Sequence, residues 1–125
     1  MKKFLPLLIL TIISCQTKQD FVLAPVDFAN KIKETPDAIV LDVRRVDELP
    51  AGVIEHSINI VYDPSFDTKL ADLPKKPIFI YCASGIRSAK AAKILREKGY
   101  GPVYELQGGF NQWLDSNMPA AVVGQ

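Results

Sequence analysis

Apolar and polar blocks alternate along residues 21–120 and predict short buried strands separated by helices. The clearest strand covers residues 77–81, a continuous apolar run of β-forming side chains that is typical of a central strand buried on both faces. The clearest helix covers residues 88–98, and Gly99 follows it as a C-terminal cap. The side chains predicted to face inward from this helix are Ala89, Ala92, Ile94 and Leu95.

Weaker patterns complete an alternation of strands and helices. They predict strands over residues 21–23, 38–43, 57–61 and 103–106 and helices over residues 25–33, 66–73 and 110–116. Such an alternation predicts an α/β fold, a three-layer α/β/α sandwich with a central, mostly parallel sheet. Ligands of these sheets bind beyond the carboxyl ends of the strands. Cys82 directly follows the central strand, so we expect it at such a position.

The first residues have a different pattern. Lys2 and Lys3 precede an apolar stretch at residues 4–13, which is too short to span a bilayer and is typical of a secretory signal peptide. Residues 12–15 read I-I-S-C and resemble the bacterial lipobox, whose cysteine is acylated and becomes the mature N-terminus. The alternative is an ordinary signal peptide in which Cys15 is incidental.

This N-terminal pattern predicts the organisation and location of the chain. We expect a lipoprotein signal peptide at residues 1–14, a lipid-anchored tether at residues 15–20 and one domain at residues 21–120. Acyl chains such as palmitate on Cys15 would hold the protein on a membrane of the bacterial cell envelope, on the periplasmic or outer-membrane side.

Composition excludes several classes of function. The 125 residues include 15 basic and 14 acidic ones, so no basic field is available to bind nucleic acid. With Cys15 used by the lipid, one cysteine, Cys82, and one histidine, His56, are left, which is too few for a closed metal site. We therefore expect neither a metal nor another cofactor.

The segment that joins the central strand to the next helix carries the candidate chemistry. From Cys82 to Ser88 it reads C-A-S-G-I-R-S. Backbone N–H groups of such a loop converge on one point next to a helix N-terminus, which should lower the pKa of Cys82 below the ~8.5 of a free thiol. Gly85 permits the turn, Arg87 offers a forked donor to an oxyanion, and the hydroxyls of Ser84 and Ser88 donate to sulfur or cap the helix. The simpler alternative is a capped helix beside a buried cysteine.

This loop resembles the active-site loop of the rhodanese homology domain, which reads C-x-x-G-x-R-S after a strand. Three further segments resemble that family in the same order along the chain. They are residues 41–44 (L-D-V-R) with Glu48, residues 52–60, and residues 106–109 (L-Q-G-G) with Trp113. The resemblance covers roughly residues 22–119.

The resemblance implies a sulfurtransferase or persulfide carrier in which Cys82 accepts sulfane sulfur with the help of Arg87. It implies that the substrate-binding loop consists of Ala83, Ser84, Gly85, Ile86 and Ser88. Asp42, Arg44 and Glu48 would support the site rather than touch the substrate. The implied partners are a small sulfur-containing anion or persulfide donor and an acceptor that is a thiol, including a protein thiol, or a cyanide-like molecule.

Three positions depart from the family pattern. Val53 stands where the family has a histidine after the glycine. Ala83 stands where many relatives carry a cationic or polar residue, which leaves Arg87 as the only charge in the loop and argues against efficient use of thiosulfate. His56 stands where a glycine is usual, and we interpret it as a solvated loop residue rather than a catalytic one. Phe110 and Trp113 are interpreted as core residues.

Two other functions compete with sulfur transfer. Dual-specificity phosphatases of the cell-cycle class share the fold, but their C-x-x-x-x-x-R loop is one residue longer than the segment from Cys82 to Arg87. The chain also lacks an evident aspartate general acid in a motif. A non-catalytic binding module is the second alternative, and the presence of both Cys82 and Arg87 argues against it.

Overall fold

The computed structural model describes residues 1–9 and 18–124. Residues 1–9 form no helix or strand, and their side chains are exposed. Within the described ranges, no helix is both long and apolar enough to cross a membrane. Cys15 lies outside the described residues, so its acylation stays a prediction.

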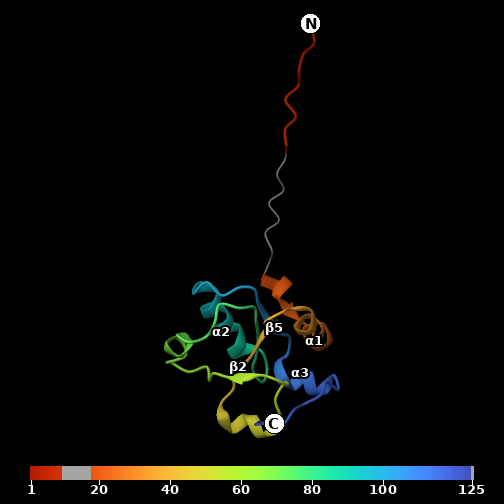
Figure 1. Ribbon diagram of the computed structural model, residues 1–125. Coiled ribbons are helices and arrows are strands. Elements are labelled where there is room, and N and C mark those ends of the chain that lie inside the picture. The colour runs from red at the N-terminus through yellow and green to blue at the C-terminus, as the bar shows by residue number, and fades with distance from the viewer. Residues whose placement is uncertain (10–17, 125) are drawn as a thin grey trace.

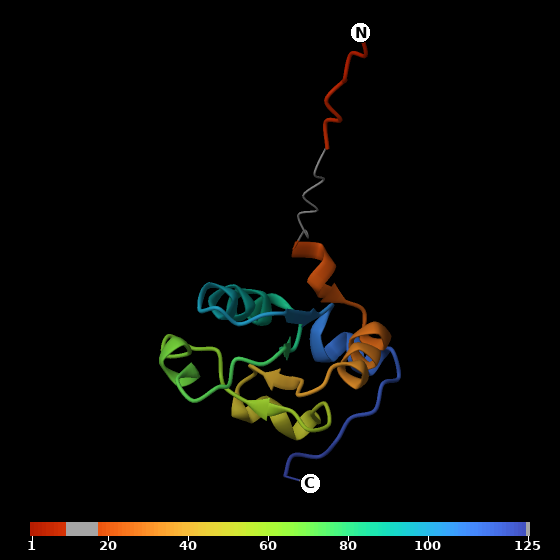
Figure 2. The same ribbon diagram turned by 45° about the horizontal axis from the view of Figure 1, so that its top comes forward.

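A parallel sheet forms the centre of the fold (Figures 1 and 2). Its five strands in the described residues are β1 (Val22–Leu23), β2 (Ile39–Asp42), β3 (Ile58–Asn59), β4 (Ile78–Tyr81) and β5 (Val103–Leu106). Their order across the sheet is β1-β5-β4-β2-β3, and all neighbouring pairs are parallel. All four residues of β4 are buried, as the continuous apolar run predicted.

Helices cover both faces of the sheet, which confirms the predicted three-layer α/β/α fold (Figures 1 and 2). Helices α1 (Pro25–Glu34) and α3 (Gly109–Asp115) cover one face, and α2 (Ile86–Glu97) and the 3-10 helix η3 (Asp67–Leu70) cover the other. Two further 3-10 helices are η1 (Lys18–Phe21) and η2 (Val46–Ala51).

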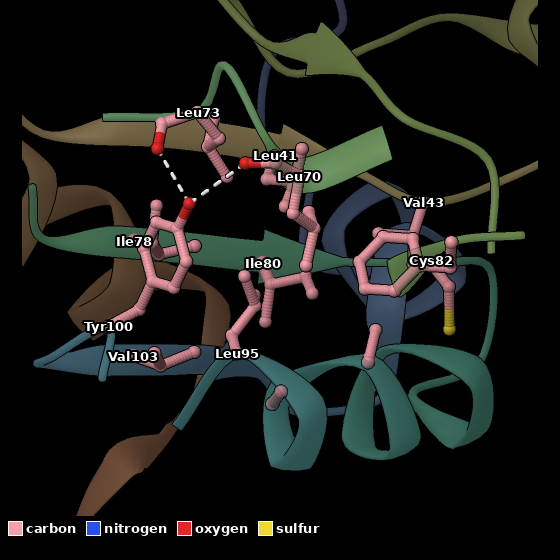
Figure 3. Packing of buried hydrophobic residues seen from close by; sticks show 13 residues of the cluster. Leu41, Val43, Leu70, Leu73, Ile78, Ile80, Cys82, Leu95, Tyr100 and Val103 are labelled. Carbon is pink, nitrogen blue, oxygen red and sulfur yellow. Dashed lines mark hydrogen bonds between the residues drawn. The ribbon is translucent and has the colours of Figure 1, made fainter. Parts of the chain in front are cut away.

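Successive side chains of each strand point to opposite faces, so the strands supply two separate cores. Under α1 and α3 the core residues are Phe28, Val40, Ile54, Phe79, Tyr81, Leu106, Phe110 and Trp113. Under α2 and η3 they include Leu41, Val43, Ile78, Ile80, Cys82, Ala91, Ala92, Leu95 and Val103 (Figure 3). The predicted core positions of Phe110 and Trp113 are therefore confirmed.

The predicted helix over residues 66–73 is shorter in the structure. Only the single 3-10 turn η3 forms, and Pro74 follows soon after it. The hydroxyl of Tyr100 donates to the carbonyl oxygens of Leu70 and Leu73, at 3.1 and 2.6 Å (Figure 3). Because this distant side chain satisfies the carbonyl groups, the segment is held without a longer helix.

The helix after β4 begins two residues earlier than predicted, at Ile86. Gly85 precedes it with φ at +99°, so the chain turns within one residue and Arg87 falls in the first helical turn. Ala89, predicted to face inward, is only partly buried. The fully buried positions are Ser88, Ala91, Ala92 and Leu95.

Candidate active site

Cys82 occupies the carboxyl end of the central strand. It follows Tyr81, the last residue of β4, and its side chain is fully buried. Its sulfur points away from the row of aliphatic side chains and toward the beginning of α2 (Figure 3). The one thiol in the described residues therefore lies where parallel α/β sheets bind their ligands.

Backbone N–H groups after Cys82 donate hydrogen bonds to this sulfur. The backbone N–H of Gly85 donates to Sγ of Cys82 at 3.1 Å, and the backbone N–H of Ser88 donates to it at 3.4 Å. The thiol in turn lies 3.4 Å from Oγ of Ser88, to which it donates when protonated. This arrangement is the anion nest expected from the sequence, formed where the loop meets α2.

The nest changes the acidity of Cys82. Burial by itself raises the pKa of the thiol, because it disfavours the charged form. Hydrogen bonds from the hydroxyl and backbone of Ser88 and from the backbone of Gly85 and Ser84 act in the opposite direction. Their combined effect is larger, so the pKa of Cys82 lies below that of an ordinary thiol, and the thiolate is the favoured nucleophile.

The start of α3 holds the first two carbonyl groups of the loop backbone. The N–H of Phe110 donates to the carbonyl of Cys82 at 2.8 Å, and the N–H of Asn111 donates to the carbonyl of Ala83 at 3.0 Å. These two carbonyl groups are held by α3, while N–H groups further along the loop point to the sulfur. Because α3 and the loop are distant in sequence, no local pattern predicts this support.

The close approach of α3 requires Gly109, and we expect Gly109→Ala to destabilise the protein. A Cβ there would lie 2.5 Å from the carbonyl oxygen of Ala83, and φ of Gly109 is +62°. Backbone strain and overpacking together should lower the free energy of unfolding by about 2–4 kcal/mol, measured by urea denaturation. Gly99→Ala is the matched control, because its φ is +88° but no atom lies within 4 Å of the added Cβ. Equal losses in the two variants would contradict the steric explanation.

Asp42 and Arg44 form a buried ion pair at the end of β2. Nε of Arg44 donates to both carboxylate oxygens of Asp42 at 3.0 and 3.1 Å, and Nη2 donates to Oδ2 at 2.7 Å. Nη2 also donates to the carbonyl of Gly52 at 2.8 Å, and the guanidinium lies 4.4 Å from the ring centre of Phe110. The side-chain amide of Asn59 donates to the carbonyl oxygens of Asp42 and Arg44. Both charged groups are thus paired within the fold, and their supporting role stays a prediction that the Arg44→Ala variant tests.

Arg87 has a partner that the sequence did not indicate. Its Nη1 and Nη2 donate to the two carboxylate oxygens of Glu48, at 2.7 and 2.8 Å. The sequence predicted a fork open to an oxyanion, whereas the structure places a carboxylate in that fork. The two residues are separated by 39 positions, so no local pattern joins them.

The remaining residues that the sequence singled out differ in exposure. Ala83 is partly buried, and Ser84 and Ile86 are exposed. His56 lies on the surface, and its Nε2 is 3.5 Å from a carboxylate oxygen of Glu55. Its side chain is 85% exposed, which agrees with the interpretation as a solvated loop residue.

No group of three or more possible metal ligands occurs within residues 1–9 and 18–124.

A buried thiol held by N–H groups at the carboxyl edge of a parallel sheet defines a class of α/β proteins with a cysteine nucleophile. A family model described as the rhodanese-like domain matches residues 25–116, which is most of the chain and includes the whole loop. The chain therefore belongs to the rhodanese-like domain family.

Curated relatives of the chain include a sulfurtransferase and several hydroxylases. It is 29% identical over 92 residues to a sulfurtransferase from Allochromatium vinosum, a match that covers 73% of this chain and 85% of that protein. It is 35% identical over 96 residues to a tRNA uridine(34) hydroxylase from Prochlorococcus marinus, covering 69% of this chain and 31% of the relative. The chain thus spans about a third of the length of the hydroxylases it matches.

The solved structures agree with the family assignment. A rhodanese-related protein from Thermoplasma volcanium superimposes with a TM-score of 0.67 at 30% sequence identity. The match covers 81% of this chain and 97% of the neighbour. Together with the named sulfurtransferase, this similarity supports a sulfur-related enzyme family.

Proposed function

We propose that the protein is a sulfurtransferase or persulfide carrier that transfers sulfane sulfur through a persulfide on Cys82. The observation that carries this proposal is the cradle of N–H groups from Gly85 and Ser88 around the sulfur of Cys82. A cradle of this kind stabilises the negative charge of a thiolate and of a terminal persulfide sulfur. The family and the named sulfurtransferase relative support the same chemistry.

The proposed first step is attack of the Cys82 thiolate on the outer sulfur of a donor. An S–S bond forms between Cys82 and that sulfur, and the bond between this sulfur and the rest of the donor breaks. The bonding electron pair leaves with the donor remnant, which is sulfite when the donor is thiosulfate. Because the nest donors are fixed before the reaction, they need no reorganisation to hold the new anionic sulfur.

The proposed second step returns the enzyme to its starting state. The thiolate of an acceptor, or cyanide, attacks the outer sulfur of the persulfide, and the S–S bond to Cys82 breaks. The bonding electrons return to Cys82, which leaves as a thiolate stabilised by the loop hydrogen bonds. The acceptor becomes a persulfide, or thiocyanate when cyanide accepts the sulfur. No external oxidant or reductant is required.

The mass of the peptide containing Cys82 tests the proposal. The reduced protein is treated anaerobically with thiosulfate, an inorganic polysulfide or an organic persulfide, and Cys82 should gain one sulfur atom that cyanide then removes. No gain with any donor would refute the proposal and favour a binding module. Hydrolysis of an aryl phosphate should be negligible, because Glu48 occupies the fork of Arg87 that a phosphate would need.

We also propose that acylated Cys15 attaches the protein to a membrane of the bacterial cell envelope, which rests on the sequence of residues 12–15. Replacing Cys15 with alanine should release nearly all of the protein from the membrane fraction or leave an unprocessed precursor. Fractionation and the mobility of the protein on a gel measure both outcomes. Unchanged membrane partition together with unchanged mobility would contradict the anchor.

A further inference from the structure

Glu48 is held in a fixed position at the site by two different elements. Its Oε2 accepts a hydrogen bond from the backbone N–H of Arg45 at 2.8 Å and one from Nη1 of Arg87 at 2.7 Å. Its Oε1 accepts a hydrogen bond from Nη2 of Arg87 at 2.8 Å. The carboxylate is therefore anchored to the start of its own 3-10 helix, η2, and accepts hydrogen bonds from both terminal nitrogens of Arg87.

The ion pair favours the charged forms of both partners. The hydrogen bonds from Arg87 lower the pKa of Glu48 to about 2, against the opposing effect of burial and with further help from the N–H of Arg45. The same hydrogen bonds raise the pKa of Arg87, to which the negative charges of Glu48 and Cys82 also contribute. Arg87 directly precedes Ser88, whose N–H donates to the sulfur of Cys82, and its charge is balanced by the carboxylate of Glu48.

The remaining charges of this region also cancel. The charged side chains of residues 42–48 and of the loop at residues 82–88 are Asp42, Arg44, Arg45, Asp47, Glu48 and Arg87. They form three ion pairs, Asp42 with Arg44, Arg45 with Asp47, and Glu48 with Arg87. Residues 42–48 and the loop at residues 82–88 therefore carry no net charge and offer an incoming anion no net positive charge.

We propose that Glu48 is a specificity-determining residue that neutralises Arg87 and thereby directs the site toward sulfane donors of low charge. Such donors are persulfides and thiosulfonates, and the disfavoured class is represented by the thiosulfate dianion. This inference rests on the proposed sulfur transfer for its substrate class. Its physical basis, the balanced charge around Cys82, applies to any reagent that attacks or is attacked by the thiol.

Electrostatics gives the size and direction of the effect. One unbalanced positive charge near Cys82 attracts each additional negative charge on a donor. At typical separations this attraction changes the reaction rate roughly fivefold. Removing the charge of Glu48 while keeping its shape should therefore favour anionic reagents by about this factor. The effect should shrink as ionic strength rises, because salt screens exposed charges.

The first experiment needs no sulfur transfer. The rates at which iodoacetate and iodoacetamide alkylate Cys82 are compared, since these reagents differ by one negative charge, and the product is located on the peptide containing Cys82. The ratio of the alkylation rate with iodoacetate to the rate with iodoacetamide should rise roughly fivefold in Glu48→Gln. Changes in thiol pKa or access affect both reagents together and cancel in the ratio. Asp47→Asn is the matched control, because it removes one negative charge from the same 3-10 helix at a position that is 72% exposed. Water and salt screen that charge, so the rate ratio should stay close to that of the wild type.

The second experiment applies the same comparison to donors. Thiosulfate and methanethiosulfonate both present a sulfur bound to a sulfonyl group but carry two and one negative charges, and both leave one sulfur on Cys82 while releasing sulfite or methanesulfinate. The thiosulfate-to-methanethiosulfonate rate ratio should also rise roughly fivefold in Glu48→Gln but not in Asp47→Asn. Unchanged or lower ratios for both reagent pairs would overturn the role of Glu48. A raised alkylation ratio without sulfur transfer from any donor would uphold the electrostatic role of Glu48 and refute the proposed function.

Discussion

Replacing Cys82 with serine is expected to abolish persulfide formation and sulfur transfer, lowering the rate by at least about three orders of magnitude. Serine keeps the shape of the side chain and can accept the N–H groups of Gly85 and Ser88. Its hydroxyl is not ionised near neutral pH and forms no persulfide, so the cradle is kept while the nucleophile is lost. The fold should change little, which circular dichroism and thermal melting would verify.

The pH dependence of the wild type provides a second measure of the same site. Only the thiolate attacks a donor, so the rate falls as the pH drops below the pKa of Cys82. Because hydrogen bonds from Ser88, Gly85 and Ser84 outweigh burial and lower that pKa, the loss should occur at a lower pH than for an ordinary cysteine. The rate of alkylation of Cys82 by iodoacetamide as a function of pH measures this directly.

Two outcomes would contradict this account of Cys82. Sulfur transfer that persists in Cys82→Ser would place the nucleophile elsewhere, and Cys15 is the other cysteine of the chain. An alkylation profile with its midpoint above the usual thiol value would show that burial outweighs the loop hydrogen bonds. Assignment of the added sulfur to one peptide separates Cys82 from Cys15.

Replacing Arg44 with alanine is expected to cause a large loss of stability, about 3–5 kcal/mol. The guanidinium is 2% exposed, and its partner Asp42 is 1% exposed. Removing Arg44 leaves the carboxylate of Asp42 buried without its cation and the carbonyl of Gly52 without its donor. For a domain of about this size, the melting temperature should fall by more than about 10 °C. Urea denaturation and thermal melting measure the loss.

The neighbouring arginine supplies the control. Arg45 pairs with Asp47 on the surface, where the two side chains are 61% and 72% exposed, so Arg45→Ala should change stability by less than about 1 kcal/mol. Sulfur transfer by Arg44→Ala should decline only to the extent that the protein unfolds. If Arg44→Ala keeps the wild-type melting temperature and yet loses all transfer, Arg44 acts in the site itself.

The layers of the fold and the position of the thiol follow from local features of the sequence. The apolar run at residues 77–81 predicted a doubly covered central strand, because only such a strand hides both of its faces from water. Cys82 at the end of that strand and Gly85 before a helix then predicted the nest of N–H groups. These features are local, since a strand, a turn and a helix start are set by neighbouring residues, and they were found without knowledge of distant contacts.

The distant groups that meet at the site, in contrast, are set by tertiary contacts. Glu48 and Arg87 bind each other across 39 positions, and the N–H groups of Phe110 and Asn111 hold the loop from the start of α3. The sequence placed Glu48 beside the site but predicted a free fork on Arg87, because residue types show that charges exist and not which charges pair. Pairing depends on how the parallel strands are ordered across the sheet, and that order brings η2, the loop and α3 to one edge.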